Sequence, residues 1–239
     1  MKKLIKYLGI ALAIMVVLGV WPAVKIYAEL SKSASEDPQV WEEDIQALEE
    51  RHADGPGAIL FMGSSSIRLW GTLAQDMQPM TVVNRGFGGA KIADTVFYAS
   101  RLVDIEQPSA IVIFVGTNDI HPGATKKPAV VLASYQELVL RITTSHGALP
   151  IYYIAITPSL MRWDVWPIAN EANKMIESYS DTVPNLHFID TGDALMKNDA
   201  PNKDYYVIDG LHLNKNGYRL WTQIIRPRLL DEVYSKTPK

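Results

Sequence analysis

The sequence contains no cysteine among its 239 residues. This absence excludes disulfide bonds, thiolate metal sites and a lipid attached to cysteine. The chain also lacks an excess of positive charge, because its formal net charge is −3. The first 28 residues hold four of the 23 Lys and Arg residues and none of the 26 Asp and Glu residues, so the remainder carries a net charge of −7. An acidic domain without a basic stripe is a poor candidate for nucleic-acid binding, and we expect no nucleic-acid partner.

Motifs for metal ions and nucleotides are lacking as well. The five histidines show no H-x-x-x-H spacing, which would place two imidazoles on one face of a helix. The glycine-rich stretch Gly86–Ala90 departs from G-x-G-x-x-G because its third glycine comes too early, and no Gly-Lys-Ser/Thr sequence follows it. We therefore expect a protein that works without a metal ion or an organic cofactor.

One long apolar run lies near the start of the chain. Tyr7–Val24 carries no charge and follows Lys2, Lys3 and Lys6. As a helix it would reach roughly 27 Å, close to the thickness of the hydrocarbon core of a membrane. The lysines would remain cytoplasmic, which places the following residues outside. An uncleaved membrane anchor, a cleaved signal peptide and a buried core helix all remain open.

The rest of the chain is expected to form one domain. Residues 1–28 are the anchor or signal segment, residues 29–39 (ELSKSASEDPQ) a short polar linker, and residues 40–239 the domain itself. A hydrophobic content of 48% suits a single well-packed core. We expect the domain in the cell envelope, held at the inner membrane on the periplasmic side, or secreted if the first segment is cleaved. The sequence does not indicate an oligomeric state.

Short apolar strands alternate with amphipathic helices along this domain. The alternation predicts an α/β fold, a flavodoxin-like three-layer αβα sandwich around a five-stranded parallel sheet, preceded by the N-terminal hydrophobic helix. The expected strands are Ala58–Met62, Thr81–Asn84, Ala110–Val115, Ile151–Ile156 and Leu186–Asp190. The expected helices are Val40–His52, Ser66–Met77, Ile92–Ile105, Pro128–His146, Ala169–Ser180 and Asn214–Tyr234.

Ligands of such sheets bind at the carboxyl ends of the strands, so the residues that follow each strand are informative. Three serines, Ser64 to Ser66, follow Gly63 after the first strand. A serine at this place can cap a helix or act as a nucleophile. A nucleophilic serine needs a histidine as base and a carboxylate behind it. Only His212 has an acid at a short spacing in a turn, Asp209, although this pair also suits a purely structural turn.

Two other strand ends carry groups that could stabilise an oxyanion. The loop Gly86–Ala90 offers a free backbone N–H group, or is only a turn that requires positive φ. Asn118 in the sequence GTND offers a side-chain amide, a good oxyanion donor, although asparagine is also common in plain turns. Each signal is weak by itself.

Taken together and in this order, these motifs resemble the SGNH hydrolase superfamily, also called GDSL esterases and lipases. The resemblance covers about residues 58–218 and is carried by GSSS, NRGFGG, GTND and DGLH. It is nearest to the bacterial thioesterase/lysophospholipase branch and the platelet-activating-factor acetylhydrolase branch. It implies five active-site residues, which are the nucleophile Ser65, the oxyanion donors Gly89 and Asn118, the base His212 and its partner Asp209.

One position departs from the family pattern. The family usually has aspartate directly before the nucleophile, and here Ser64 occupies that position. That aspartate is not the acid of the triad, so the implied triad is complete. Its role in bracing the loop either passes to Ser64 or is lost. Ser66 is expected as the N-cap or in the first turn of the following helix.

The resemblance implies a serine ester hydrolase that acts on a small acyl ester, a lysophospholipid or an acetylated glycan. Alternatives are a polysaccharide O-acetylesterase of the cell envelope, an inactive relative that serves as a binding module, and an acyltransferase. Trp70, Trp163 and Trp166 are the aromatic residues expected to line the substrate pocket, and Met161–Pro167 (MRWDVWP) is a candidate specificity loop. Packing of these residues on the rim of the sheet is the other interpretation.

Overall fold

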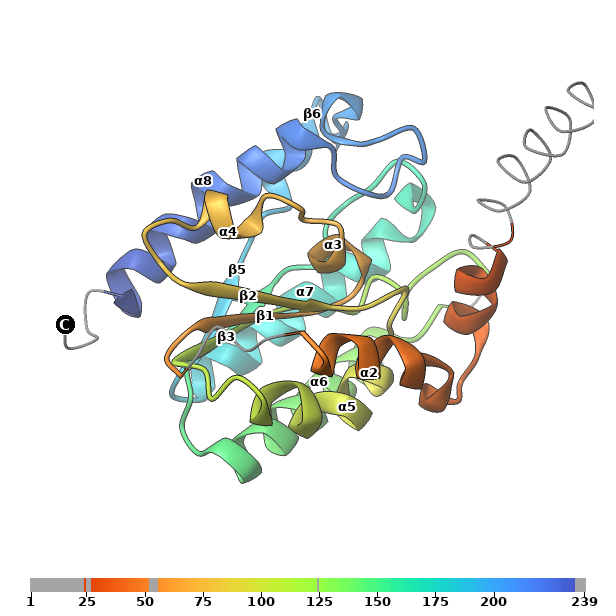
Figure 1. Cartoon of the computed structure of the whole chain (residues 1–239). Coiled ribbons are helices and arrows are strands. Elements are labelled where there is room, and N and C mark those ends of the chain that lie inside the picture. Colours follow the sequence, from red (N-terminus) through yellow and green to blue (C-terminus); the bar gives the residue numbers. More distant parts are fainter. Residues whose placement is uncertain (1–23, 25–26, 52–55, 124, 235–239) are drawn as a thin grey trace, which may run out of the picture.

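The computed structural model of the protein describes residues 24, 27–51, 56–123 and 125–234. Five parallel strands form one sheet in the order β2-β1-β3-β4-β5 (Figure 1). The strands are β1 (Ile59–Gly63), β2 (Val82–Gly86), β3 (Ala110–Phe114), β4 (Ile151–Ile154) and β5 (Leu186–Ile189). The predicted parallel sheet is confirmed, and each strand begins and ends within two residues of the expected positions.

Helices cover both faces of the sheet and complete the expected three layers (Figure 1). Successive strand residues point to opposite faces, so Leu60 and Met62 belong to one core cluster while Ile59 and Phe61 belong to the other. The first cluster lies under α2 (Glu42–Glu49), α5 (Ile92–Asp104), α6 (Pro128–His146) and α7 (Trp166–Thr182). The second lies under α3 (Ser65–Arg68), α4 (Leu73–Asp76) and α8 (Lys215–Glu232).

Short elements fill the connections. They are the 3₁₀ helices η1 (Pro38–Trp41), η2 (Trp163–Val165), η3 (Asp193–Leu195) and η4 (Lys203–Tyr205), and the two-residue strands β6 (Met196–Lys197) and β7 (Ala200–Pro201). The sequence did not predict the β6–β7 pair, because strands of two residues are too short to show a period of alternation.

The helix predicted over Ser66–Met77 is two separate helices, α3 and α4. The chain turns between them so that the Trp70 side chain enters the core, where its indole N–H donates a hydrogen bond to the Asp76 carboxylate at 2.7 Å. Ile67, Trp70, Leu73 and Met77 are all buried and are spaced as one helix face, so burial alone does not require the break. Gly71 lies at the break, and glycine weakens a helix interior.

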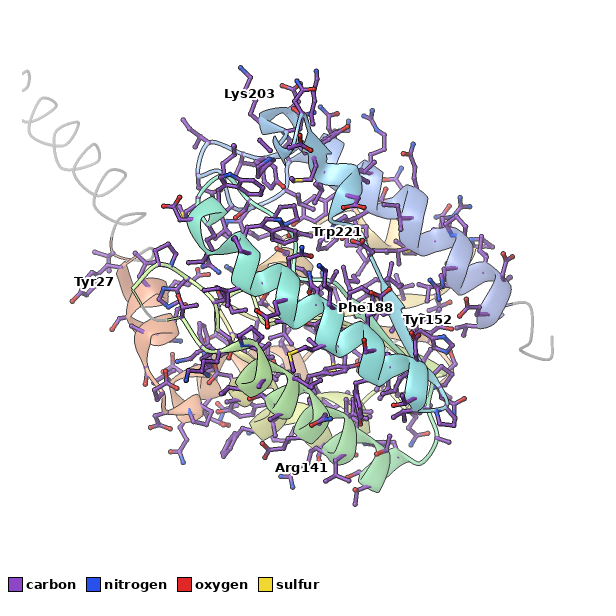
Figure 2. All side chains as sticks on the ribbon, turned by 180° about the vertical axis from the view of Figure 1, so that it is seen from behind. Tyr27, Arg141, Tyr152, Phe188, Lys203 and Trp221 are labelled. Carbon is purple, nitrogen blue, oxygen red and sulfur yellow. The ribbon has the colours of Figure 1, made fainter. Side chains whose placement is uncertain are left out.

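The start of the described chain differs from the expected linker. Residues 27–34 form a helix, the red helix ahead of α2 in Figure 1, where the sequence predicts a polar linker from residue 29. Its charged side chains bind the domain, because Glu29 pairs with Arg68 and Lys32 pairs with Asp44 at 2.7 Å. Figure 2 shows Tyr27 of this helix at the edge of the molecule, directed away from it. We call residues 27–34 the N-terminal helix.

The predicted hydrophobic helix at the start of the chain lies almost entirely outside the described residues. Within the part of the chain that the structure describes, no helix is long and apolar enough to span a membrane. Whether residues 1–28 anchor the protein or are cleaved therefore stays a prediction.

Candidate active site

The chain leaves β1 through a glycine that the neighbouring strand requires. Gly63 has a φ of +127°. A Cβ at this position would lie only 2.1 Å from the carbonyl oxygen of Phe114, so any side chain is excluded. The turn makes Ser64 the residue before α3 and Ser65 the first residue of that helix. Ser65 is thereby held at the carboxyl end of β1, an inner strand of the sheet.

A chain of hydrogen bonds connects Ser65 to a histidine and a carboxylate. The Ser65 Oγ lies 2.8 Å from His212 Nε2, although 147 positions separate the two residues. On the other side of the ring, His212 Nδ1 lies 2.7 Å from Asp209 Oδ2. The distances suit a serine that donates to Nε2 and an Nδ1–H that donates to the carboxylate. The arrangement can therefore remove a proton from Ser65.

Asp209 is held as a carboxylate by its surroundings. Burial by itself would raise the pKa of Asp209, but hydrogen bonds from His212 and from two backbone N–H groups outweigh burial and lower it. The backbone donors are the N–H groups of Leu211 and His212, at 2.8 and 2.9 Å from Asp209 Oδ1. One carboxylate oxygen thus closes the turn and the other orients the imidazole. The contacts of Asp209 Oδ1 are those of the structural turn, and the contact of Oδ2 with His212 is the one that the catalytic interpretation requires.

The expected oxyanion donors lie beside this chain of hydrogen bonds. A Cβ added to Gly89 would lie 3.8 Å from Asn118 Nδ2, which places the glycine next to the amide. Asn118 Nδ2 donates one hydrogen to the Ala90 carbonyl at 3.0 Å and keeps a second one. The backbone N–H groups of Ser65 and Gly89 have no acceptor among the described residues. These three N–H groups are the donors available to an oxyanion.

Asn118→Ala is expected to lower kcat by roughly 10²–10³ and to leave KM nearly unchanged, because the amide would act on the transition state more than on the bound ester. Steady-state kinetics on a p-nitrophenyl ester would measure both constants. The unfolding midpoint of the variant serves as the control for its fold, since Asn118 also donates to Ala90. An unchanged kcat in a folded variant would remove Asn118 from the oxyanion hole.

Arg162 joins the site from the loop after β4, and the sequence indicated only the loop and not this residue. Its guanidinium donates to the Asn118 Oδ1 at 3.0 Å and also to the carbonyl oxygen of Thr117. Because Asn118 Oδ1 accepts the hydrogen bond from Arg162, the amide oxygen faces the guanidinium and the Nδ2 hydrogens face the other way. Burial lowers the pKa of Arg162 to about 10, and Asp119 opposes that shift, so the side chain stays charged at neutral pH.

The N-terminal helix forms one wall beside the oxyanion donors. The Ser33 Oγ occupies the space over Gly89, because it would lie 1.9 Å from a Cβ added there. Leu30, Ser33 and Ala34 share a cavity of about 360 Å³ with Asn118 and Arg162. His121, Pro122 and Met161 complete the lining. The residues expected as a linker therefore shape the site.

The two neighbours of Ser65, Ser64 and Ser66, are part of the turn and the helix start around it. Ser66 lies in the first turn of α3, as expected, and its carbonyl oxygen accepts a hydrogen bond from the Tyr218 hydroxyl at 2.9 Å. Ser64 is fully buried, and its hydroxyl has no hydrogen-bond partner among the described residues. Within this part of the chain, Ser64 does not take over a bracing role through its side chain.

The expectation that Trp70 contacts substrate is wrong. Trp70 is only 1% exposed and stacks on Tyr218 of α8 with ring centroids 5.2 Å apart. The reason is its place in the turn between α3 and α4, which directs the indole under α8. Trp163 and Trp166 are partly exposed and stack on each other at 6.3 Å, and neither lines the cavity beside Asn118. Their contact with substrate stays a prediction.

Trp70→Ala is expected to lower the free energy of unfolding by about 3–5 kcal/mol, because it removes a fully buried indole from a packed core. The matched variant Trp163→Ala removes a partly exposed indole and should change stability much less. Urea unfolding of both variants would measure the difference. Equal stability losses would contradict the placement of Trp70 in the core.

No group of three or more His, Asp or Glu residues that could hold a metal ion occurs in the described ranges. The site can be described entirely through hydroxyl, imidazole, carboxylate, amide and guanidinium groups. The expectation that no cofactor is needed stays a prediction.

Comparison with known proteins places the chain in a family. Residues 52–220 match the model of the GDSL-like lipase/acylhydrolase family, which spans well over half of the chain. All five residues of the implied site lie within the matched range. A search of curated proteins finds no match.

Several solved structures have a similar fold. A GDSL-like lipase from Bacteroides thetaiotaomicron is 15% identical with a TM-score of 0.65, and the alignment covers 82% of this chain and 98% of that chain. An aryl esterase from M. smegmatis is 17% identical with a TM-score of 0.59, covering 74% and 99%. A family 3 carbohydrate esterase from Clostridium thermocellum is 13% identical with a TM-score of 0.58, covering 75% and 98%. Identities this low show a shared fold, and substrate must be argued from the site.

Proposed function

The chain belongs to the GDSL-like lipase/acylhydrolase family and is a hydrolase that acts on ester bonds, and on this premise we propose that Ser65, His212 and Asp209 form its catalytic triad. The observation that carries the proposal is the pair of hydrogen bonds from Ser65 through His212 to Asp209, at 2.8 and 2.7 Å. A serine hydroxyl becomes a useful nucleophile when a neighbouring base accepts its proton.

The reaction follows from these contacts in two halves. Ser65 Oγ attacks the acyl carbon while its proton passes to His212 Nε2, and Asp209 stabilises the resulting imidazolium. His212 then gives this proton to the oxygen of the leaving alcohol as the ester bond breaks. A water molecule repeats the sequence on the acyl-enzyme, returning the proton to Ser65 and releasing the acid. In each half, His212 Nε2 takes a proton from the attacking nucleophile and gives it to the oxygen that leaves.

The negative charge on the tetrahedral intermediate is assigned to three donors of the site that have no acceptor among the described residues. They are the backbone N–H groups of Ser65 and Gly89 and the second amide hydrogen of Asn118. These donors lie in the segments that directly follow β1, β2 and β3. They are held in place before substrate binds, so little reorganisation is needed when negative charge develops on the substrate oxygen.

The surface around the site favours an ester with an apolar part. Leu30, Met161 and Ile208 are exposed apolar side chains near the site, and we call them the apolar rim. Leu30 and Met161 line the same cavity, and the backbone N–H of Met161 donates to Gly210 O in the loop that carries Ile208. We infer a small acyl ester or a lysophospholipid rather than a fully polar glycan ester as the preferred substrate class.

The location of the enzyme is part of the proposal. The apolar run Tyr7–Val24 with its preceding lysines supports a catalytic domain outside the cytoplasm, held at the membrane or secreted after cleavage. The N-terminal helix begins three residues after this run and lies against the active site. A membrane-held enzyme would therefore present its apolar rim close to the lipid surface.

The test is hydrolysis of p-nitrophenyl esters from acetyl to palmitoyl by the full-length protein, beside labelling with a fluorophosphonate probe. Activity that extends to longer acyl chains supports the apolar substrate class. Activity confined to acetyl esters would contradict a lysophospholipid substrate and leave a small acyl ester or the polysaccharide O-acetylesterase. Absence of both labelling and hydrolysis would contradict the proposed triad and favour an inactive binding protein.

A further inference from the structure

Arg162 has more hydrogen-bond donors than the protein uses. One terminal nitrogen donates to the carbonyl oxygen and the hydroxyl of Thr117, and the other donates to Asn118 Oδ1. A guanidinium carries five N–H donors in a planar fork. The Nε–H and one further N–H therefore have no acceptor among the described residues. Two such donors in one plane match the two oxygens of a carboxylate or phosphate.

The charge of Arg162 is also uncompensated. Within the described ranges no carboxylate forms an ion pair with its guanidinium. The carboxylate that acts electrostatically on Arg162 is that of Asp119. Asp119 already forms an ion pair with Lys126 at 2.9 Å and accepts a hydrogen bond from the backbone N–H of Ile92 at 3.0 Å. Lys91, which also faces Asp119, is paired with Glu36 at 2.7 Å. A partly buried cation without a paired anion is energetically unfavourable, so the Arg162 guanidinium would attract an anionic group of a ligand.

The cavity beside Asn118 gives an anion room to reach Arg162. It has a volume of about 360 Å³, and among the described residues that line it Arg162 alone has a permanent charge. His121 is the one other ionisable side chain among these described lining residues, and histidine carries no negative charge. Asn118 belongs to the same lining, so a group in the cavity lies next to the proposed oxyanion hole. Leu30, Pro122 and Met161 supply apolar surface for the remainder of a ligand.

We propose that the enzyme prefers esters that carry a carboxylate or phosphate group, and that Arg162 binds this anion in the cavity beside Asn118. This inference rests on the proposed esterase function and adds the chemical class of its substrate. The hydrogen bond from Arg162 to Asn118 ties anion binding to the oxyanion hole, because the same guanidinium orients the Asn118 amide. Arg162 thus acts as a specificity-determining residue and, for every substrate, as a positioning residue.

The experiment compares two pairs of esters that differ in one charge, using the full-length protein. The first pair, 4-acetoxybenzoate and its methyl ester, places the charge in the alcohol part. The second pair, 4-nitrophenyl hydrogen adipate and 4-nitrophenyl methyl adipate, places it in the acyl part. The measured quantity is the ratio of kcat/KM for the charged ester to kcat/KM for its neutral partner. Rates with Ser65→Ala are subtracted as background.

We expect the wild-type enzyme to prefer the charged ester in at least one pair. Arg162→Met should lower that ratio roughly tenfold or more, since it removes a charge-assisted double hydrogen bond. Arg162→Lys should keep part of the preference because it keeps the charge. The control Arg141→Met removes an exposed arginine from α6, which Figure 2 labels, and should leave the ratio unchanged.

Several outcomes would overturn the inference. An equal loss with charged and neutral esters in Arg162→Met would mean that Arg162 only positions Asn118. A wild-type enzyme that prefers the neutral ester in both pairs would also refute it, and this result needs no folded Arg162 variant. If the enzyme hydrolyses the neutral esters and the charge has no effect on kcat/KM, the inference is refuted while the esterase function stands. Failure to hydrolyse any of the four esters above the Ser65→Ala background would instead refute the esterase function together with the inference.

Discussion

Ser65→Ala is expected to lower kcat by about 10⁶, which is the loss seen when a serine nucleophile is removed from a triad. The variant retains His212, Asp209 and the oxyanion donors but has no atom that can form the acyl-enzyme. Residual hydrolysis would come from these remaining groups acting on a bound water molecule. Steady-state rates with p-nitrophenyl esters, together with fluorophosphonate labelling, measure the effect. Labelling should disappear completely.

The neighbouring serines supply matched controls for this prediction. Ser64→Ala and Ser66→Ala remove the same atom at adjacent positions and leave the hydrogen bond between Ser65 and His212 in place. Both variants should remain active and should still react with the fluorophosphonate probe. If Ser66→Ala abolishes activity while Ser65→Ala does not, the nucleophile lies one residue later than proposed.

Asp209→Asn is expected to lower kcat by about 10⁴, the second largest effect, because an amide can donate to His212 Nδ1 and stabilise the wrong tautomer. In that tautomer Nε2 carries the proton and cannot accept one from Ser65. The side-chain oxygen of the introduced asparagine would still accept the backbone N–H groups of Leu211 and His212, so the turn should persist. The measurements are kcat and the rate of fluorophosphonate labelling, and both should fall together.

Asp231→Asn, an exposed change on α8, is the matched control and should leave kcat unchanged. An unfolding midpoint near that of the wild-type protein would show that the loss in Asp209→Asn is not caused by unfolding. Nearly full activity of a folded Asp209→Asn variant would contradict the role of Asp209 in orienting His212. It would leave this residue as a structural brace of the turn.

Distinct physical features made much of the fold predictable. The five strands are short apolar runs bounded by glycine or polar residues, and they alternate with amphipathic helices, a pattern that permits few arrangements other than a covered parallel sheet. Helix α6 was predicted with its observed ends, because Pro128 begins it and Gly147 follows it. The helix expected over Ser66–Met77 was wrong in its continuity, and the break lies at Gly71, a weak helix former.

The sequence by itself determined which strand ends carry chemistry. Parallel strands bring their carboxyl ends to one edge, so motifs that are far apart along the chain must converge there. For that reason the serines at 64–66, Asn118 and the pair Asp209 and His212 were candidates, and the family resemblance singled out Ser65 among the serines. The structure joins Ser65, His212 and Asp209 by hydrogen bonds.

Only the tertiary structure decided what surrounds those groups. Trp70 turned into the core, Ser33 came to lie over Gly89, and Arg162 reached Asn118 across 44 positions of sequence. These contacts depend on the path of loops and on long-range packing, for which local sequence carries no periodic signal. The physical reason for the division is that a strand end is defined by its own strand, whereas a pocket wall is defined by whichever segment packs against it.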